Sequence, residues 1–407
     1  MTQRLAQRLE HIEPFYVMEC AKAASEIAAS PLCDPAQGGR PMIFLNIGEP
    51  DFTATPPVRE AAERAIRAGR TQYTDATGLP ALREATSARY AQRFGLSIDP
   101  ARIVITAGAS AALQLACLAL VDRDDEVLLP DPSYPCNRHF VAAAEGRPIL
   151  LPEGPEARFQ LDADGVRAAW GVRTRGVLLA SPSNPTGTSI DPDEMRRIVE
   201  FVRSRGGFTI VDEIYLGLSF DERFGRSALM HGDDVVSINS FSKYFCMTGW
   251  RLGWMVLPPA LVPAVEKLAQ NLYICASSVA QQAALACFEP ASIDEYERRR
   301  AEFRARRDFL VPALDRIGLR VPVMPDGAFY AWADCSAHAA SSWDFAFELM
   351  RRAQVAITPG RDFGRDAAER FVRFSYASSM EQLHEAVERL GSLLSVTKLG
   401  ERVLMKR

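Results

Sequence analysis

The most informative stretch of this sequence is VVSINSFSKYFCMTGWRLG, residues 235–253. It opens with the run 235–239, which predicts a buried strand, and Lys243 follows shortly after that strand. Open α/β sheets place their ligands at the carboxyl ends of strands, so Lys243 lies where a ligand is expected. An amine with an ordinary pKa of about 10.4 acts as a nucleophile near neutral pH only if it is desolvated or lies beside other cations. A surface lysine in a serine-rich turn is the alternative interpretation.

The same stretch carries groups that suit a phosphate. Ser240 and Ser242 supply hydroxyl donors, and Arg251 supplies a planar guanidinium that can hold an anion beside the amine. The motif TAGAS at 106–110 stands between a predicted strand and a predicted helix, which aims free backbone N–H groups and the positive helix end at an anion. A tight strand-to-helix turn without a ligand explains this last motif equally well.

Two further turns place polar side chains at the ends of predicted strands. The motif SPSNPTG at 181–187 gathers turn-forming residues around Asn184, whose amide can donate and accept hydrogen bonds at once. The motif VDEIY at 211–215 runs an apolar strand into Asp212. Because an unpaired buried carboxylate is costly, a functional partner is expected for Asp212, with a helix N-cap or a structural ion pair as the alternative.

Outward from these motifs, the chain alternates short apolar runs with longer segments of helical period. Besides 235–239, strands are predicted at 103–106, 126–129, 148–151, 176–180, 208–211 and 253–257. Helices are predicted at 111–121 and at 193–204, the second begun by the capping residue Asp191 and by Pro192. The strands are apolar on both faces, as buried parallel strands are. The pattern predicts an α/β fold with a mostly parallel seven-stranded sheet between helices.

Beyond residue 290 the pattern changes. A long, charged helix is predicted at 294–315, and its arginines indicate a solvated helix face rather than a binding patch. Strand-like segments follow at 328–332, 355–358 and 370–376. We therefore expect a large domain over residues 51–290 and a smaller α+β domain formed by residues 1–50 and 291–407.

Composition excludes several classes of protein. Among 407 residues, 47 Lys and Arg stand against 51 Asp and Glu, a formal net charge of -4, so no general attraction to nucleic acid or anionic lipid is expected. The 8 cysteines form no CxxC pair and no close cluster with the 5 histidines, so no metal site is expected. The first residues lack the apolar run of a secretory signal, and no segment approaches about 18 apolar residues. These features predict a cytoplasmic protein without a membrane partner.

Taken together, the motifs resemble those of the class I and II aminotransferases, enzymes of the fold type I group that depend on pyridoxal 5'-phosphate (PLP). They follow the family's order and spacing across nearly the whole chain: NIGEPDF (46–52), QYT (72–74), TAGAS (106–110), DPSYP (131–135), SPSNPTG (181–187), VDEIY (211–215), SFSKYFCMTGWRLG (240–253) and VRFSYA (372–377). The resemblance implies a fold type I architecture, in which the small domain closes over an active site on the large PLP-binding domain.

The resemblance also implies roles around the cofactor ring. Lys243 matches the Schiff-base lysine, which also acts as general base, and Asp212 matches the residue that faces the pyridine nitrogen. Tyr215 and Asn184 match the residues at the ring oxygen, and Tyr134 matches the aromatic that stacks on the ring. An anionic Asp212 keeps the ring nitrogen protonated, so that the ring can accept electrons.

For the phosphate of PLP, the resemblance implies a cup made by the backbone N–H groups of Ala109 and Ser110 and by the side chains of Ser240, Ser242 and Arg251. Tyr73 matches a tyrosine that reaches the phosphate of the neighbouring subunit. A homodimer with composite active sites is therefore implied.

For the substrate, the resemblance places Arg373 against the α-carboxylate, with Asn184 and the backbone of Gly48 completing the grip. Relatives that prefer dicarboxylates recruit a further cation, often from the segment that matches residues 270–278. Here that segment reads QNLYICASS, without Lys or Arg. Neutral aliphatic or aromatic amino donors are therefore expected.

The implied reaction moves an amino group from an L-amino acid to a 2-oxo acid in a ping-pong cycle between PLP and pyridoxamine phosphate. Three alternatives stay open at this point. The first is a PLP-dependent lyase of the β-elimination type on the same fold, which the cofactor motifs do not separate from an aminotransferase. The second is a regulator that keeps PLP without turnover, and the third is a structural protein that has lost catalysis. The intact Lys243, Asp212, Asn184 and Tyr215 argue against the third.

Overall fold

The computed structural model describes residues 4–404, and the side chains of residues 4–395. Its centre is a seven-stranded sheet with the order β2-β8-β7-β6-β5-β3-β4, in which β8 runs antiparallel to both neighbours and the other pairs are parallel. The strands are β2 (Ile103–Thr106), β3 (Glu126–Asp131), β4 (Arg147–Pro152), β5 (Thr174–Ala180), β6 (Phe208–Asp212), β7 (Val235–Ser240) and β8 (Gly253–Val256). The predicted α/β fold and all its predicted large-sheet strands are confirmed.

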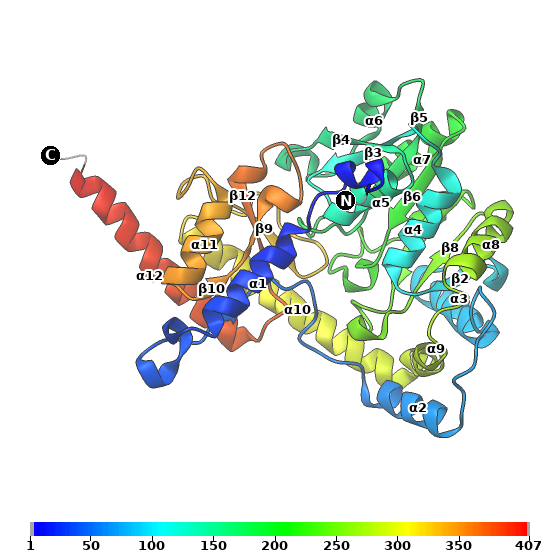
Figure 1. The fold of residues 1–407 in the computed structure, drawn as a ribbon, viewed down its shortest axis with the longest axis horizontal. Coiled ribbons are helices and arrows are strands. Elements are labelled where there is room, and N and C mark those ends of the chain that lie inside the picture. The colour runs from blue at the N-terminus through cyan, green and yellow to red at the C-terminus, as the bar shows by residue number, and fades with distance from the viewer. Residues whose placement is uncertain (1–3, 405–407) are drawn as a thin grey trace.

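Some of the α-helices cover the two faces of this sheet (Figure 1). Others pack around a smaller part of the molecule, which contains the remaining short strands. The α-helices are α1 (Tyr16–Ala28), α2 (Pro56–Arg67), α3 (Pro80–Phe94), α4 (Ala109–Leu120), α5 (Pro135–Ala143), α6 (Ala163–Ala169), α7 (Pro192–Ser204), α8 (Val262–Leu272), α9 (Ser278–Ala284), α10 (Pro290–Arg316), α11 (Ser342–Arg352) and α12 (Met380–Leu404). As predicted, α7 begins after Asp191, whose side chain accepts a hydrogen bond from the N–H of Asp193. Among the described residues, none of these helices has the length and apolar character needed to cross a bilayer.

Burial on both faces explains why the strands read as continuous apolar runs. On β6, Ile210 packs into the hydrophobic cluster beneath α4 and α8, whereas Val211 packs into the larger cluster on the opposite face. On β8, Met255 and Val256 divide between the two clusters in the same way. Successive side chains of a strand point to opposite faces, so a parallel sheet covered by helices needs apolar residues at every position.

Two small sheets lie beside the large one (Figure 1). In the first, β1 (Ile43–Phe44) pairs in parallel with β10 (Val355–Ala356). In the second, β12 (Phe371–Ser375) lies between β11 (Thr358–Pro359) and β9 (Tyr330–Asp334) and is antiparallel to both. The pairing of β1 with β10 joins the N-terminal segment to the C-terminal part of the chain. The division into residues 51–290, 1–50 and 291–407 stays a prediction.

The strand limits of this smaller part differ from those expected. The predicted strand 355–358 is divided between β10 and β11, which belong to different sheets. The predicted strand 328–332 begins only at Tyr330, because Ala328 has a φ of 59°, outside the range of extended backbone. Short edge strands depend on their partners, which the local sequence does not specify.

The long helix α10 has the predicted position but not the predicted surface. Two of its arginines are buried: Arg299 is 8% exposed and Arg306 is 2% exposed. The guanidinium of Arg306 makes two hydrogen bonds to the carboxylate of Asp51, at 2.8 and 2.9 Å, and Arg299 donates to the carbonyl oxygen of Thr53 at 2.6 Å. The predicted solvated face therefore does not include these two side chains, which anchor the segment that follows Gly48.

Candidate active site

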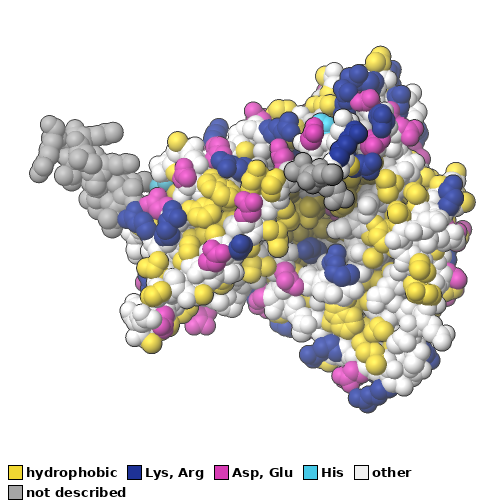
Figure 2. Space-filling model, viewed as in Figure 1, with side chains coloured by type: hydrophobic (Ala, Val, Ile, Leu, Met, Phe, Trp, Pro, Cys, Tyr) yellow, Lys and Arg dark blue, Asp and Glu magenta, His cyan; other side chains and the backbone are white. Residues whose placement is uncertain are grey.

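A cavity of about 280 Å³ lies at the carboxyl ends of β5, β6 and β7, against the strands β9 and β12. Figure 2 shows that the molecule is hollowed between its two parts on this face. The lining includes every residue predicted for the site except Tyr73: Gly48, Ala109, Ser110, Tyr134, Asn184, Asp212, Tyr215, Ser240, Ser242, Lys243, Arg251 and Arg373. Segments from seven different parts of the chain therefore meet where the sequence motifs indicated a ligand.

Lys243 reaches into this cavity from the turn after β7. Its Nζ donates a hydrogen bond to the carbonyl oxygen of Gly48 at 2.6 Å and lies 5.7 Å from the ring centroid of Tyr215. Burial, reinforced by the positive charge of Arg373, lowers the pKa of Lys243 to about 8. A substantial fraction of this amine is therefore neutral near physiological pH, which a nucleophile or a general base requires.

Asp212 is the last residue of β6, on the strand next to the one that leads to Lys243. Its carboxylate is 3% exposed and accepts a hydrogen bond from the N–H of Ile214 at 3.1 Å. Burial raises the pKa of Asp212 to about 7, against the opposing effects of that hydrogen bond and of Lys243. A cationic group placed opposite this carboxylate would favour the charged form and lower its pKa.

This raised pKa predicts a pH dependence of stability for protein prepared without cofactor. An unfolded aspartate titrates near about 3.9, whereas the folded pKa of Asp212 is raised to about 7. Between these values the folded state binds more protons, so this group lowers stability progressively as pH rises from about 4 to 7, with no further change above. We expect the free energy of unfolding of wild type, relative to Asp212→Asn, to fall across this window in urea titrations. A constant difference between the two proteins would contradict the assignment.

The groups predicted to hold a phosphate form one wall of the cavity. Gly108 precedes α4 with a φ of 84°, and a Cβ there would lie 2.7 Å from Nη2 of Arg251. Only glycine allows this backbone and this approach, so the free N–H groups at the start of α4 lie beside the guanidinium. On the other side, the Oγ of Ser240 accepts a hydrogen bond from the N–H of Ser242 at 3.0 Å. The wall thus combines backbone donors, hydroxyl groups and one cation.

Arg373 approaches from β12 and is 2% exposed. Its Nη1 donates to Oδ1 of Asn184 at 2.8 Å, and its Nη2 donates to the carbonyl oxygen of Asn46 at 2.8 Å. The guanidinium carbon lies 4.4 Å from the ring centroid of Tyr330 and 4.9 Å from that of Phe363. Its Nε is buried without a hydrogen-bond partner in the described part of the chain. A buried cation with a free donor, fixed between two rings, suits a carboxylate ligand.

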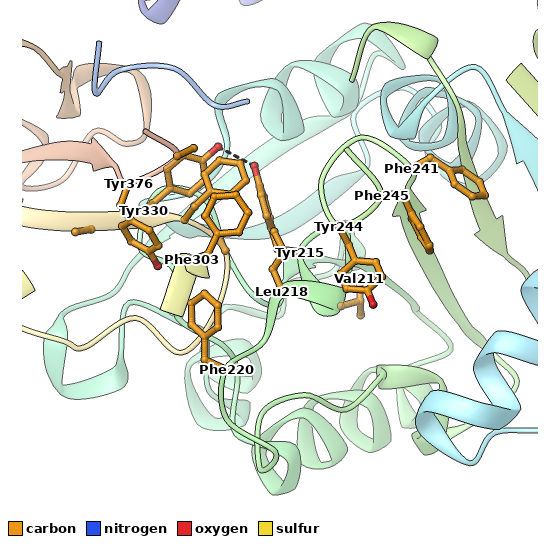
Figure 3. Close-up of a cluster of buried hydrophobic side chains, with 14 of the residues drawn as sticks. Val211, Tyr215, Leu218, Phe220, Phe241, Tyr244, Phe245, Phe303, Tyr330 and Tyr376 are labelled. Carbon is orange, nitrogen blue, oxygen red and sulfur yellow. Dashed lines mark hydrogen bonds between the residues drawn. The ribbon is translucent and has the colours of Figure 1, made fainter. Parts of the chain in front are cut away.

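Tyr330 is an aromatic residue of the site that escaped sequence reasoning. Tyr330 lines the cavity from β9, and its hydroxyl lies 2.8 Å from the hydroxyl of Tyr215 (Figure 3). It falls in a segment predicted as a strand, where an aromatic residue usually serves the core. The local sequence held no signal for its function, because the partner hydroxyl belongs to a different part of the chain.

The N-terminal segment supplies a further wall that the sequence did not indicate. Phe15, Val17 and Met18 line the cavity, and the ring of Phe15 meets that of Tyr134 edge-on at 6.3 Å between centroids. The first turn of α1 donates two backbone N–H groups to the carboxylate of Asp362. This carboxylate takes the place of an N-cap side chain, which α1 lacks, and so fixes the apolar wall.

Tyr73 lies apart from the cavity of its own chain. It stands in the loop between α2 and α3, and its side chain is 78% exposed. The neighbouring Gln72 accepts a hydrogen bond at its carbonyl oxygen from Ser278, the last residue of the segment 270–278. Three cationic side chains, Lys243, Arg251 and Arg373, line the cavity, and none comes from that segment. No group of three or more potential metal ligands occurs among the described residues.

Comparison with known proteins identifies relatives over nearly the whole length of the chain. The sequence profile of the family "Aminotransferase class I and II" matches residues 40–390. The chain is 38% identical over 395 residues to a valine–pyruvate aminotransferase of Mycobacterium tuberculosis, covering 97% of this chain and 99% of that protein. It is 34% identical over 363 residues to an aspartate aminotransferase of Pyrococcus horikoshii, covering 88% and 92%.

A solved structure gives the same result for the fold. The crystal structure of an aminotransferase from Mycobacterium tuberculosis superposes with a TM-score of 0.91 at 38% sequence identity, and the match covers 97% of this chain and 100% of that one.

Proposed function

Since this chain belongs to the class I and II aminotransferases, we propose a role in amino-group transfer for each polar residue that lines its cavity. The protein is a PLP-dependent enzyme that transfers an amino group from an amino acid to a 2-oxo acid. The comparisons give the lyase alternative no support.

The residues of the cavity fit this cofactor. Asp212 is a buried carboxylate whose raised pKa leaves it in need of a cationic partner, which a protonated ring nitrogen provides. Gly108 lets the guanidinium of Arg251 lie against the start of α4, so that the cation and the helix N–H groups can hold one anion together. With Ala109, Ser110, Ser240 and Ser242, this wall would hold the phosphate, while Tyr134, Asn184 and Tyr215 would hold the ring. When bound, PLP supplies an aldehyde that links covalently to amines and a ring that accepts electrons.

The residues of the chain would then share the steps of the reaction. Arg373 and Asn184 hold the α-carboxylate of the donor, and the carbonyl of Gly48 keeps the Nζ of Lys243 at the cavity wall. The neutral Nζ of Lys243 takes the proton from the α-carbon of the donor. As an ammonium, the same Nζ would return a proton to the carbon on the cofactor side of the donor nitrogen. The anionic carboxylate of Asp212 balances the positive ring nitrogen throughout. Water then cleaves the bond between the donor carbon and its nitrogen, so the donor leaves as a 2-oxo acid and its nitrogen would remain on the cofactor. A second 2-oxo acid, held by the same residues, would take up that nitrogen with loss of water and the reverse proton transfers, which makes the cycle ping-pong.

One observation carries this proposal. Lys243, with its lowered pKa, Asp212, with its raised pKa, and the buried Arg373 converge on a single cavity from the two neighbouring strands β7 and β6 and from β12. Perturbed titratable groups that share a cavity are typical of catalytic sites.

For the amino donor, we propose a neutral, apolar L-amino acid. Phe15, Val17, Met18 and Ile214 give the cavity an apolar wall, while its three cations are already assigned to the phosphate, the proton transfer and the α-carboxylate. A second carboxylate would lie in this cavity without a cationic partner, which is costly. The valine–pyruvate relative agrees with this preference, and the aspartate relative represents the opposite one.

A screen of single amino acids tests the donor. Protein saturated with PLP is mixed with valine, leucine, phenylalanine, aspartate or glutamate, and the loss of cofactor absorbance and the 2-oxo acid formed are followed. We expect kcat/KM for the best apolar donor to exceed that for aspartate by about 10- to 200-fold, the size of discrimination that a hydrophobic pocket supports. Equal or higher activity with aspartate would contradict the apolar donor, and ammonia release in place of amino transfer would contradict the reaction.

The assembly and location are also proposals. A homodimer would bring the exposed Tyr73 of one subunit to the phosphate wall of the other, which accounts for an aromatic side chain left 78% exposed on a loop. We propose the cytoplasm as the location, because eight cysteines that form no disulfide in the described part of the chain suit a reducing compartment.

A further inference from the structure

Tyr330 connects the two sides of the active-site cavity. It is completely buried on β9, a strand of the small sheet, whereas Tyr215 follows β6 of the large sheet. Their hydroxyl groups are 2.8 Å apart, and their rings meet edge-on with centroids 5.6 Å apart (Figure 3). This hydrogen bond therefore joins elements that are 115 residues apart in the chain.

The ring of Tyr330 also supports the substrate-binding arginine. In the antiparallel pair of β9 and β12, Tyr330 stands opposite Ser375 and Trp332 stands opposite Arg373. Tyr330 and Arg373 are thus diagonal neighbours, and side chains at such positions share one face of the sheet. The guanidinium carbon of Arg373 lies 4.4 Å from the ring centroid of Tyr330, a cation–π contact in a desolvated place.

A third contact involves the residue that holds the lysine. A Cβ at Gly48 would lie 2.8 Å from the hydroxyl oxygen of Tyr330, so the glycine allows this close approach. The carbonyl of the same Gly48 accepts the hydrogen bond from Lys243. Tyr330 therefore contacts Tyr215, which is proposed to face the cofactor, and Arg373, which is proposed to bind the substrate carboxylate. It also lies against Gly48, whose carbonyl accepts the hydrogen bond of Lys243.

We propose that Tyr330 is a positioning residue, whose hydroxyl orients the hydroxyl of Tyr215 toward the cofactor and whose ring holds the guanidinium of Arg373 for the substrate carboxylate. This inference rests on the proposed roles of Tyr215 and Arg373. A phenol has one proton to donate. If Tyr215 donates its proton to the ring oxygen of the cofactor, its own oxygen accepts the proton of Tyr330, and each bond of such a chain strengthens the other.

The charged and titratable groups around this pair come from several elements. Asp212 ends β6, Lys243 follows β7, Tyr134 precedes α5 and Arg373 lies on β12. Glu49 acts on the same lysine from the segment after Gly48, and Arg251 acts on it from the phosphate wall. All of these stay in place in a Tyr330→Phe variant, which removes a single oxygen atom.

The experiment compares cofactor-loaded wild type with Tyr330→Phe, Tyr215→Phe and the double variant. The pH midpoint of the cofactor absorbance change is measured for each, together with kcat and KM for the best apolar donor. Donation to the ring oxygen favours its charged form, so the midpoint rises when that donation is weakened. We expect Tyr330→Phe to raise the midpoint by roughly half a unit to one unit, less than Tyr215→Phe does. The double variant matches Tyr215→Phe, because the two hydroxyls act through one path.

A second substitution separates the hydroxyl from the ring. Tyr330→Phe keeps the ring under Arg373, so KM for the donor changes less than about threefold, whereas Tyr330→Leu removes the cation–π contact and raises KM by roughly 5- to 30-fold. Tyr376→Phe is the matched control, since Tyr376 (Figure 3) is equally buried. Its hydroxyl donates to the carbonyl oxygen of Gly327. This variant leaves both the midpoint and KM unchanged.

The possible outcomes are distinct. An unchanged midpoint in Tyr330→Phe, together with a raised midpoint in Tyr215→Phe, overturns the inference and leaves the proposed function intact. A shift of equal size in Tyr376→Phe also overturns it, since loss of any buried hydroxyl would then suffice. If Tyr215→Phe itself leaves the midpoint unchanged, the role proposed for Tyr215 fails first, and the inference fails with it.

Discussion

Replacing Lys243 with alanine is expected to lower the rate of amino-group transfer by on the order of 10⁴-fold, the upper range for a general acid–base group. The amine is the cavity group whose pKa, lowered to about 8, allows it to take a proton near neutral pH. Asp212 cannot replace it, because the proposed role of Asp212 opposite the ring nitrogen requires a permanent negative charge. Turnover is measured with saturating donor and 2-oxo acid, so that a change in binding does not conceal the chemical step.

The control for this variant is Lys267→Ala, on the exposed side of α8. It is expected to retain wild-type turnover. A second reading uses borohydride reduction, which fixes the cofactor to the amine that carries it. In wild type the added mass is expected on the peptide with Lys243, and in Lys243→Ala on no single peptide. If Lys243→Ala turned over within tenfold of the wild-type rate, or if the added mass lay on another lysine of the wild-type protein, a different amine would be the one that binds the cofactor and transfers the proton.

Replacing Arg373 with lysine is expected to lower kcat/KM for amino acid donors by about 100-fold, which corresponds to about 2.7 kcal/mol of transition-state binding. The loss arises although the charge is kept. Arg373 donates through two nitrogens to Asn184 and to the backbone of Asn46, and its buried Nε has no partner among the residues that the structure describes. A lysine ammonium offers no planar fork and cannot satisfy these acceptors and a carboxylate together.

Two controls test whether the loss in Arg373→Lys depends on the α-carboxylate of the substrate. Arg389→Lys changes an arginine of the same part of the chain, 6% exposed and bonded to the carbonyl oxygen of Pro41. It does not line the cavity, so kcat/KM is expected to stay within a few fold of wild type. The second control is a primary amine donor without a carboxylate, for which Arg373→Lys should equal wild type. An equal loss with this amine would mean that Arg373 supports the fold of the cavity rather than the substrate.

Local patterns in the sequence were sufficient for the large sheet and for the polar turns around Lys243, whereas Gly48, Tyr134 and Arg373 were expected only from the family resemblance. Residues 208–212 and 235–240 are apolar because both faces of the sheet are covered, and that requirement is visible without a structure. The polar residues that follow them, Asp212 and Lys243, lie at the carboxyl ends of adjacent parallel strands and so had to come close together. Gly108 and the serines around Lys243 follow the same logic at the neighbouring turns.

Contacts between distant segments needed the tertiary structure. The buried Arg306 looked like its exposed neighbours on α10, because only the approach of Asp51 gives it a partner. Phe15 and Val17 gave no sign of lining the cavity, since Asp362, far along the chain, fixes the turn that carries them.

The sequence by itself thus determined the strands of the large sheet and the polar residues at their carboxyl ends that are proposed to meet the cofactor. Periodic burial and the chemistry of turns act over a few residues and leave a local pattern. The tertiary structure alone decided which aromatic and apolar side chains complete the site, Tyr330 foremost. Such residues are chosen by the shape and hydrogen-bonding groups of whatever packs against them, and in this chain those groups come from segments more than 100 residues away.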